Sequence, residues 1–150
     1  MEQTDDRQLP EVSEREREAL HRVELGLEWL RRAHGDLVGF HHKTGHAMDH
    51  LAQAETALRD CGREDLADRL RDDCLPLGAV GDRWTYDLLE EFETDFMAHI
   101  EAAEERAREE VADGQRHVTE RHQQREWRER ARDGDDGRDR EGDADGEGGR

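Results

Sequence analysis

The chain has 150 residues, of which 32% are hydrophobic and 43% are charged, and its formal net charge is -18. This length allows one domain, but so few apolar residues can form a core only where they are concentrated. The uncharged run at residues 75–81, LPLGAVG, is far too short to cross a bilayer.

The charges are distributed unusually between residue types. Acidic side chains number 41 and basic ones 23, the acids are spread along the whole chain, and Lys43 is the only lysine. This composition resembles that of cytoplasmic proteins from extremely halophilic archaea, and it resembles no family with a named function. Many carboxylates keep a surface hydrated in concentrated salt, where the Debye length of about 3 Å screens their repulsion. The resemblance implies a cytoplasmic protein adapted to salt; the alternative is that the acids mark a basic partner.

Residues 1–12 are polar and contain Pro10, so we expect a flexible N-terminal arm. They have neither the basic nor the apolar region of a signal peptide, which again predicts a cytoplasmic protein. Ser13 and Glu16 have the spacing of a capping box and predict the start of a helix.

From there to about Asp60, apolar residues recur at intervals of three and four, which is helical periodicity. They are Leu20, Val23, Leu27, Leu30, Ala33, Leu37, Phe40, Thr44, Ala47, Met48, Leu51 and Leu58. Gly35 and Asp36 could end one helix and cap another. The periodicity continues through them without a large change of phase, so we predict one long helix, at most bent at Gly35, that ends at Cys61 and Gly62.

Two further helices follow. In the first, a short one, Leu66, Ala67, Leu70 and Cys74 share a face, and a loop containing Pro76, Gly78 and Gly81 follows it. Asp82 is a plausible N-cap for the next helix. The apolar face of that helix comprises Leu88, Leu89, Phe92, Phe96, Ile100, Ala103, Ala107 and Val111.

No segment alternates with period two, so the sequence predicts an all-α fold. We expect residues 13–112 to form a small helical bundle or a long helical hairpin with a short third helix at the turn. Residues 113–132 are polar and rich in arginine, and this segment could either continue the helix with a polar surface or fold on a partner. Residues 133–150 hold eight acids, three arginines and six glycines, which predicts a disordered acidic tail.

The only cysteines are Cys61 and Cys74, without a CxxC motif. Two thiols are too few for a thiolate metal site of the usual kind, and we expect both to be free. Cys74 has helical spacing from Leu66 and Leu70, which predicts a small buried side chain.

Histidines are concentrated at residues 39–50, GFHHKTGHAMDH. At about 100° per residue, His42, His46 and Asp49 lie opposite the apolar face, with His50 at the edge of their arc. This favours a solvated face; the alternative is a surface metal site formed by the pairs His42–His46 or His46–His50. Gly35 and Gly39 fall on the same arc and would let another helix approach.

A second group of candidate ligands involves the later helix. His99 lies among apolar residues, with Asp95 and Glu91 one and two turns before it, while His34 and His41 flank the apolar face of the first helix. If the helices pair antiparallel, these groups could form a mixed site for zinc or iron. The alternative is that such histidines are core residues satisfied by one hydrogen bond.

Two classes of function fit these patterns. The favoured class is a non-enzymatic helical module that acts by self-association or by binding another protein. We predict a symmetric homodimer, formed through the Gly35–Gly39 face or the end of the hairpin around Leu20 and Leu27. The alternative is a metal-binding bundle, ferritin-like or hemerythrin-like in type, with redox or hydrolytic chemistry.

A nucleic-acid partner is disfavoured. Residues 116–132 hold six arginines against three glutamates, and salt weakens binding that depends on so few positive charges. The sequence contains no phosphate-binding glycine loop, nucleophile elbow, HExxH or GxGxxG motif, so nothing in it indicates a particular enzyme.

Overall fold

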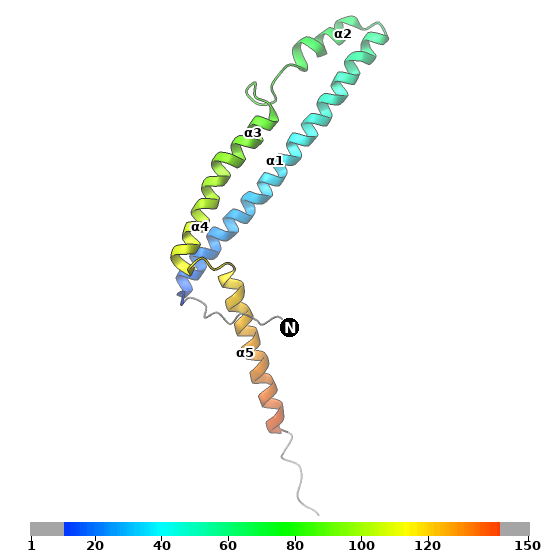
Figure 1. Cartoon of the computed structure of the whole chain (residues 1–150). Coiled ribbons are helices and arrows are strands. Elements are labelled where there is room, and N and C mark those ends of the chain that lie inside the picture. The colour runs from blue at the N-terminus through cyan, green and yellow to red at the C-terminus, as the bar shows by residue number, and fades with distance from the viewer. Residues whose placement is uncertain (1–10, 142–150) are drawn as a thin grey trace, which may run out of the picture. The chain divides into compact units, whose positions relative to one another are not determined.

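The computed structural model describes residues 11–141, with side chains from residue 11 to residue 134. The elements are α1 (Glu14–Asp60), α2 (Glu64–Arg69), η1 (Leu70–Cys74), α3 (Thr85–Glu91), η2 (Phe92–Met97), α4 (Ala98–Ala112) and α5 (Val118–Glu141). Every one of these elements is helical, which confirms the predicted all-α class (Figure 1). The chain divides into two compact units, Glu24–Glu104 and the described residues of 1–23 and 105–150, and α1 contributes to both.

Local signals set both ends of α1. The backbone N–H of Ser13 donates to the carboxylate of Glu16 at 3.0 Å, and the N–H of Glu16 donates to the Ser13 hydroxyl at 3.3 Å, which confirms the capping box. At the other end Gly62 has φ 77°. The N–H of Arg63 donates to Leu58 at 2.8 Å and that of Gly62 to Arg59 at 3.1 Å, the pattern of a Schellman motif. The helix therefore ends where the sequence predicted.

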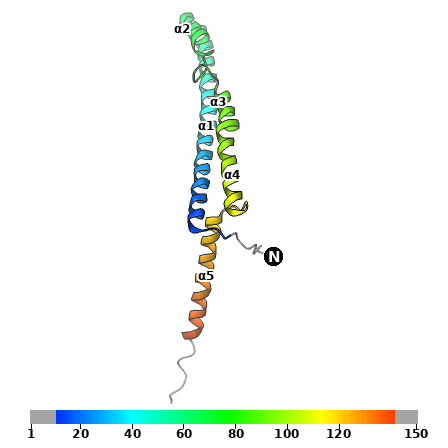
Figure 2. The same cartoon turned by 90° about the vertical axis from the view of Figure 1, so that its left-hand side faces the viewer.

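Within residues 24–104, α3 and η2 lie beside α1 (Figures 1 and 2), as the predicted hairpin with a short helix at its turn requires. The face of α1 that lies against α3 and η2 is here called the seam. Its residues form two series, each with a spacing of seven residues. One series is Leu27, His34, His41, Met48 and Glu55, and the other is Leu30, Leu37, Thr44, Leu51 and Leu58. All of these except Leu51 are buried or half-buried.

This repeat explains why α1 is continuous through Gly35. Gly35 belongs to neither series, and a Cβ added to it would meet nothing within 4 Å in the described part of the chain. A glycine in a helix costs only about 1 kcal/mol relative to alanine. The seam residues before and after Gly35 pack on the same side of α1, so they favour one continuous helix. The predicted single helix is confirmed, and the alternative of a break at Gly35 is wrong.

The helix from Thr85 onward contains a π-turn, η2, whose hydrogen bonds join residues five apart. Its inward positions include Thr85, Leu88 and Phe92, and then Met97 and Ile100, so one step is five residues long. A π-turn holds one residue more than an α-turn and rotates the residues after it by about 100° relative to a regular helix. The predicted apolar face is therefore wrong at Phe96, which is 54% exposed while Met97 takes the inward position, and at Ala103, which is exposed; Ile100, Ala107 and Val111 are half-buried as predicted.

The same effect appears in η1, which is also π-helical. The N–H of Leu75 donates to the carbonyl of Leu70, five residues earlier, at 2.9 Å. Ala67 is fully buried and Leu70 and Leu75 are half-buried, whereas Cys74 is exposed. The prediction that Cys74 is buried is wrong for this reason.

A tight turn precedes α3. Val80 and Arg83 exchange backbone hydrogen bonds of 3.3 and 3.0 Å around Gly81 and Asp82, whose φ angles are 57° and 58°. Positive φ at both central residues is typical of a type I′ turn. The Asp82 carboxylate accepts a hydrogen bond from the N–H of Gly78 at 3.1 Å, so the prediction that Asp82 caps α3 is wrong.

The other unit has a small core of its own. Leu20, Ala112 and Val118 are 2%, 0% and 5% exposed, and Val12, Ala107 and Val111 pack against them. Helix α4 ends at Ala112 and is followed by Asp113 and Gly114, which have positive φ. The buried Arg108 guanidinium donates to the Gly114 carbonyl at 3.0 Å.

The terminal segments are described only in part. Helix α5 starts inside the arginine-rich segment 113–132 and extends to Glu141, beyond the predicted boundary at residue 133. Of the predicted arm, residues 1–10 lie outside the described residues. Of the predicted acidic tail, residues 142–150 lie outside them.

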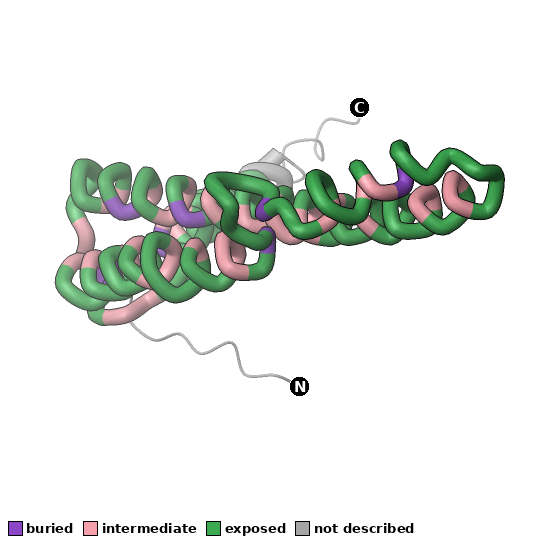
Figure 3. Tube along the Cα trace, turned by 90° about the horizontal axis from the view of Figure 1, so that it is seen from above, coloured by how far each residue is buried: buried purple, intermediate pink, exposed green. Residues whose placement is uncertain are grey.

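Few side chains are buried anywhere in the described chain (Figure 3). The buried hydrophobic residues among residues 11–134 are Leu20, Leu27, Ala67, Ala112 and Val118. Leu20 and Leu27 are 2% and 4% exposed. Association around this end of the hairpin stays a prediction.

Candidate functional site

His34 and His41 lie inside the α1 seam. The Nε2 of His34 donates to the Glu93 carboxylate at 2.7 Å, and its ring stacks on Phe92 with a centroid distance of 6.2 Å. Seven residues later, one repeat along the seam, the Nδ1 of His41 is 2.7 Å from the hydroxyl of Thr85, which is buried. Each imidazole therefore crosses the seam to one polar partner on α3 or η2. This is the arrangement of core histidines satisfied by one hydrogen bond.

His99 is placed differently from the prediction. Its side chain is 78% exposed, and its Nδ1 donates to the backbone carbonyl of Asp95, one turn earlier on the same helix, at 2.7 Å. The Asp95 carboxylate is 3.3 Å from the same nitrogen. The predicted inward orientation of His99 assumed a regular α-helix, and η2 rotates the residue away from that face.

The other predicted ligands remain separate. Glu91 is exposed and pairs with Arg83. His42, His46 and His50 are all exposed on α1, as the solvated-face interpretation requires. Across the described residues, no three His, Cys, Asp or Glu side chains form a group that could hold a metal ion. The pairs that the structure does bring together are His34 with Glu93, His99 with Asp95, and His41 with Thr85.

Both cysteines are free and exposed. The Cys61 thiol donates to the carbonyl of Leu58 at 3.3 Å, which is a local contact at the end of α1.

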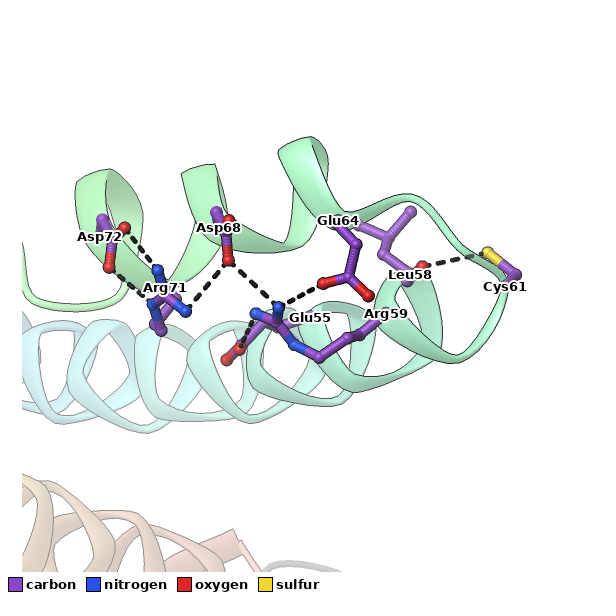
Figure 4. A network of polar contacts seen from close by, with 8 residues as sticks. All are labelled: Glu55, Leu58, Arg59, Cys61, Glu64, Asp68, Arg71 and Asp72. Carbon is purple, nitrogen blue, oxygen red and sulfur yellow. Dashed lines mark hydrogen bonds and ion pairs between the residues drawn. The ribbon is translucent and has the colours of Figure 1, made fainter.

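The turn between α1 and α2 holds the densest polar network (Figure 4). Arg59 donates to Glu55 at 3.0 Å, to Glu64 at 2.7 Å and to Asp68 at 3.1 Å, so one guanidinium joins three carboxylates from two helices. These hydrogen bonds, that to Glu55 foremost, raise the pKa of Arg59. Glu55 occupies a position in the seam where most other residues are apolar. At the end of α1 this polar network therefore takes the place of apolar packing.

Arg71 extends the network along η1. It donates to Asp68 at 3.0 Å and to Asp72 at 2.7 Å, so Asp68 is shared by both arginines. The hydrogen bond from Arg71 holds the pKa of Asp72 below its ordinary value. All these carboxylates therefore have cationic partners, and the network acts as a structural joint between α1 and the segment that follows it.

Large apolar side chains are exposed at many positions. All three tryptophans are among them, with Trp29 66% exposed, Trp84 42% and Trp127 55%. The Arg32 guanidinium carbon lies 4.5 Å from the centre of the Trp29 ring and covers part of it. Their exposure shows that these three tryptophans are not core side chains.

The sequence did contain a signal for the position of the histidines. His34 and His41 stand in the seven-residue series with Leu27 and Met48, which places them in the seam and not at its flank. Their partners Glu93 and Thr85 could not be found from that pattern, because it does not fix how far α3 is displaced along α1.

Comparison with known proteins adds no functional information: no family model, curated protein or solved structure matches this chain. Within the described helices, none is both long enough and apolar enough to cross a membrane.

Proposed function

We propose that the chain is a non-enzymatic helical module that acts by association, in the first place with a second copy of itself. The main support for this proposal is that more large hydrophobic side chains are exposed than buried. Eleven large hydrophobic side chains are exposed in the described chain, against five buried hydrophobic residues of which two are alanines. Exposed apolar surface on this scale favours contact with another protein surface.

The identity of the exposed residues supports the same proposal. Tryptophan and tyrosine are enriched where protein interfaces gain most of their binding energy. Here Trp29, Trp84, Tyr86 and Trp127 are all at least 42% exposed. The polar side chains, in contrast, are engaged in structural contacts: His34 and His41 hold the seam, and Arg59 joins two helices. A cytoplasmic setting rich in salt belongs to the proposal and rests on composition alone.

Sedimentation velocity and light scattering in molar potassium chloride test this function. Over a dilution series we expect the particle mass to fall reversibly from twice the chain mass toward the chain mass. The matched control is the same series with a detergent below its micellar concentration, which should compete for the apolar surface. A particle of single-chain mass at the highest concentrations would contradict self-association.

A further inference from the structure

One face of α1 within residues 24–104 carries an exposed apolar stripe that meets the seam only at Leu51, the one exposed member of the seam series. Trp29, Phe40 and Leu51 are 66%, 41% and 37% exposed, and they are eleven residues apart. Eleven residues make slightly more than three turns, so successive members drift by only about 20° around the helix. Ala33 and Ala47 are also exposed and fall within the same arc of about 40°. We call these five residues the Trp29–Leu51 stripe.

The spacing of the stripe is symmetric about Phe40. Alanines stand seven residues away on each side, at Ala33 and Ala47, and large side chains stand eleven residues away, at Trp29 and Leu51. In a twofold interface of two identical antiparallel helices, each residue meets the one equally distant from the axis. Trp29 would meet Leu51 of the second copy, and Ala33 would meet Ala47. The alanine layers leave room for the neighbouring large side chains to interdigitate.

Charges beside the stripe distinguish antiparallel from parallel packing. Asp36 and Lys43 lie four residues before and three residues after Phe40, on one side of the stripe. Neither makes an ion pair within the described residues. Antiparallel packing brings Asp36 of each copy to Lys43 of the other, twice by symmetry, whereas parallel packing in register puts these residues of the two copies on opposite sides of the interface, where the pairs cannot form. Such exposed pairs add little affinity in salt, but they discriminate between orientations.

We propose that two copies of this chain pair antiparallel through the Trp29–Leu51 stripe, about a twofold axis at Phe40. The inference rests on the proposed function, since it names the surface and the orientation of that self-association. It differs from the Gly35–Gly39 face, whose neighbours His42 and His46 are polar and which lies about 100° or more around the helix from the stripe.

Cysteine cross-linking tests the orientation. The background is Cys61→Ser with Cys74→Ser, which removes two exposed thiols. Chains carrying Ala33→Cys are mixed with chains carrying Ala47→Cys under mild oxidation in molar potassium chloride. We expect a disulfide-linked dimer in the mixture and none with either variant alone. Ala57→Cys, exposed about 100° away on α1, is the matched control and should give no cross-linked dimer.

The outcomes separate this inference from the proposed function. Linkage of each variant to itself would show a parallel pair and overturn the proposal. A dimer by light scattering without cross-linking would place the interface elsewhere, overturning the inference while leaving self-association intact. A strict monomer would overturn the proposed function itself.

Substitutions give a second, independent test of the face. Phe40→Glu places two like charges on the twofold axis, and we expect the scattering mass to fall to that of one chain while the helical circular dichroism is retained. Gly39→Leu, on the other face, should keep the dimer. Dissociation by Gly39→Leu, with Phe40→Glu still dimeric, would identify the Gly35–Gly39 face as the interface and overturn the proposal.

Discussion

Deleting Thr94 tests whether η2 absorbs one extra residue in its helix. Thr94 is exposed, and its hydroxyl donates to the Glu90 carbonyl at 2.8 Å. Without it, Phe92 and Met97 stand four positions apart, and the π-turn can close as an α-turn with both side chains still inward. We therefore expect the free energy of unfolding to change by less than about 1 kcal/mol, as for an exposed residue without tertiary contacts.

Deletion of Gly35 is the matched control, because α1 has no π-turn to absorb the change. It rotates the two halves of the α1 seam by about 100° relative to each other. The His34–Glu93 and His41–Thr85 contacts then cannot both form, which costs about 1 kcal/mol for one hydrogen bond. One half of the seam also turns out, with Leu27 and Leu30 before Gly35 or Leu37, Met48 and Leu58 after it. Each of these side chains adds about 1 kcal/mol, so the total is at least about 3 kcal/mol.

Both deletions are compared by urea unfolding, followed by far-ultraviolet circular dichroism at one protein concentration in molar potassium chloride. The slope with urea concentration should stay unchanged, so that midpoints compare free energies directly. A Thr94 deletion that costs as much as the Gly35 deletion would refute the argument that η2 accommodates an inserted residue.

Four other predictions concern the loop, the cap, the ions and the metals. Gly78→Ala should destabilise the turn before α3 by about 1–3 kcal/mol in urea unfolding, because its Cβ would lie 2.1 Å from the Asp82 carbonyl carbon; an unchanged midpoint would contradict this close approach. Ser13→Ala should cost about 1 kcal/mol near neutral pH. The hydrogen bond from Ser13 lowers the pKa of Glu16. The cap therefore stabilises the fold fully at pH values above the ordinary pKa of a glutamate, and this stabilisation is lost as the pH falls through the lowered pKa of Glu16. An equal cost of Ser13→Ala in acid would argue against this linkage. With a net charge of -18, helicity should rise across a potassium chloride series, and a fully helical protein that melts cooperatively in dilute buffer would count against adaptation to salt. Protein purified without a polyhistidine tag should carry less than one zinc or iron per chain by elemental analysis, and stoichiometric metal would favour the metal-binding alternative.

The two ends of α1 were predictable from sequence, but the cap of α3 and the phase of two later helical segments were not. A cap depends on a few adjacent residues, so Ser13, Glu16 and Gly62 were sufficient to place both ends of α1. The inward face after Phe92 depends on whether the next inward residue comes four or five positions later. Both Phe96 and Met97 are apolar, and packing against α1 decides between them. Leu75 replaces Cys74 in the same way.

The candidate site was predictable to a similar degree. The helical arcs correctly placed His42 and His46 in solvent, and they indicated that His34 and His41 lie near the second helix. The partners depended on the displacement of α3 along α1, which is set by the connection through residues 61–84 and not by local pattern. The structure consequently pairs His34 with Glu93, whereas the predicted partners were Glu91, Asp95 and His99.

The small number of buried side chains has a calorimetric consequence. Unfolding raises the heat capacity mainly by exposing apolar surface, and ordinary globular domains gain about 12–15 cal/mol/K per residue. In a single copy of this chain, side chains such as Trp29 and Phe40 are already in contact with water. The increment per residue should therefore fall below that range, which flattens the curve of stability against temperature. Heat and cold denaturation then lie far apart, and the folded population responds weakly to temperature over the range between them.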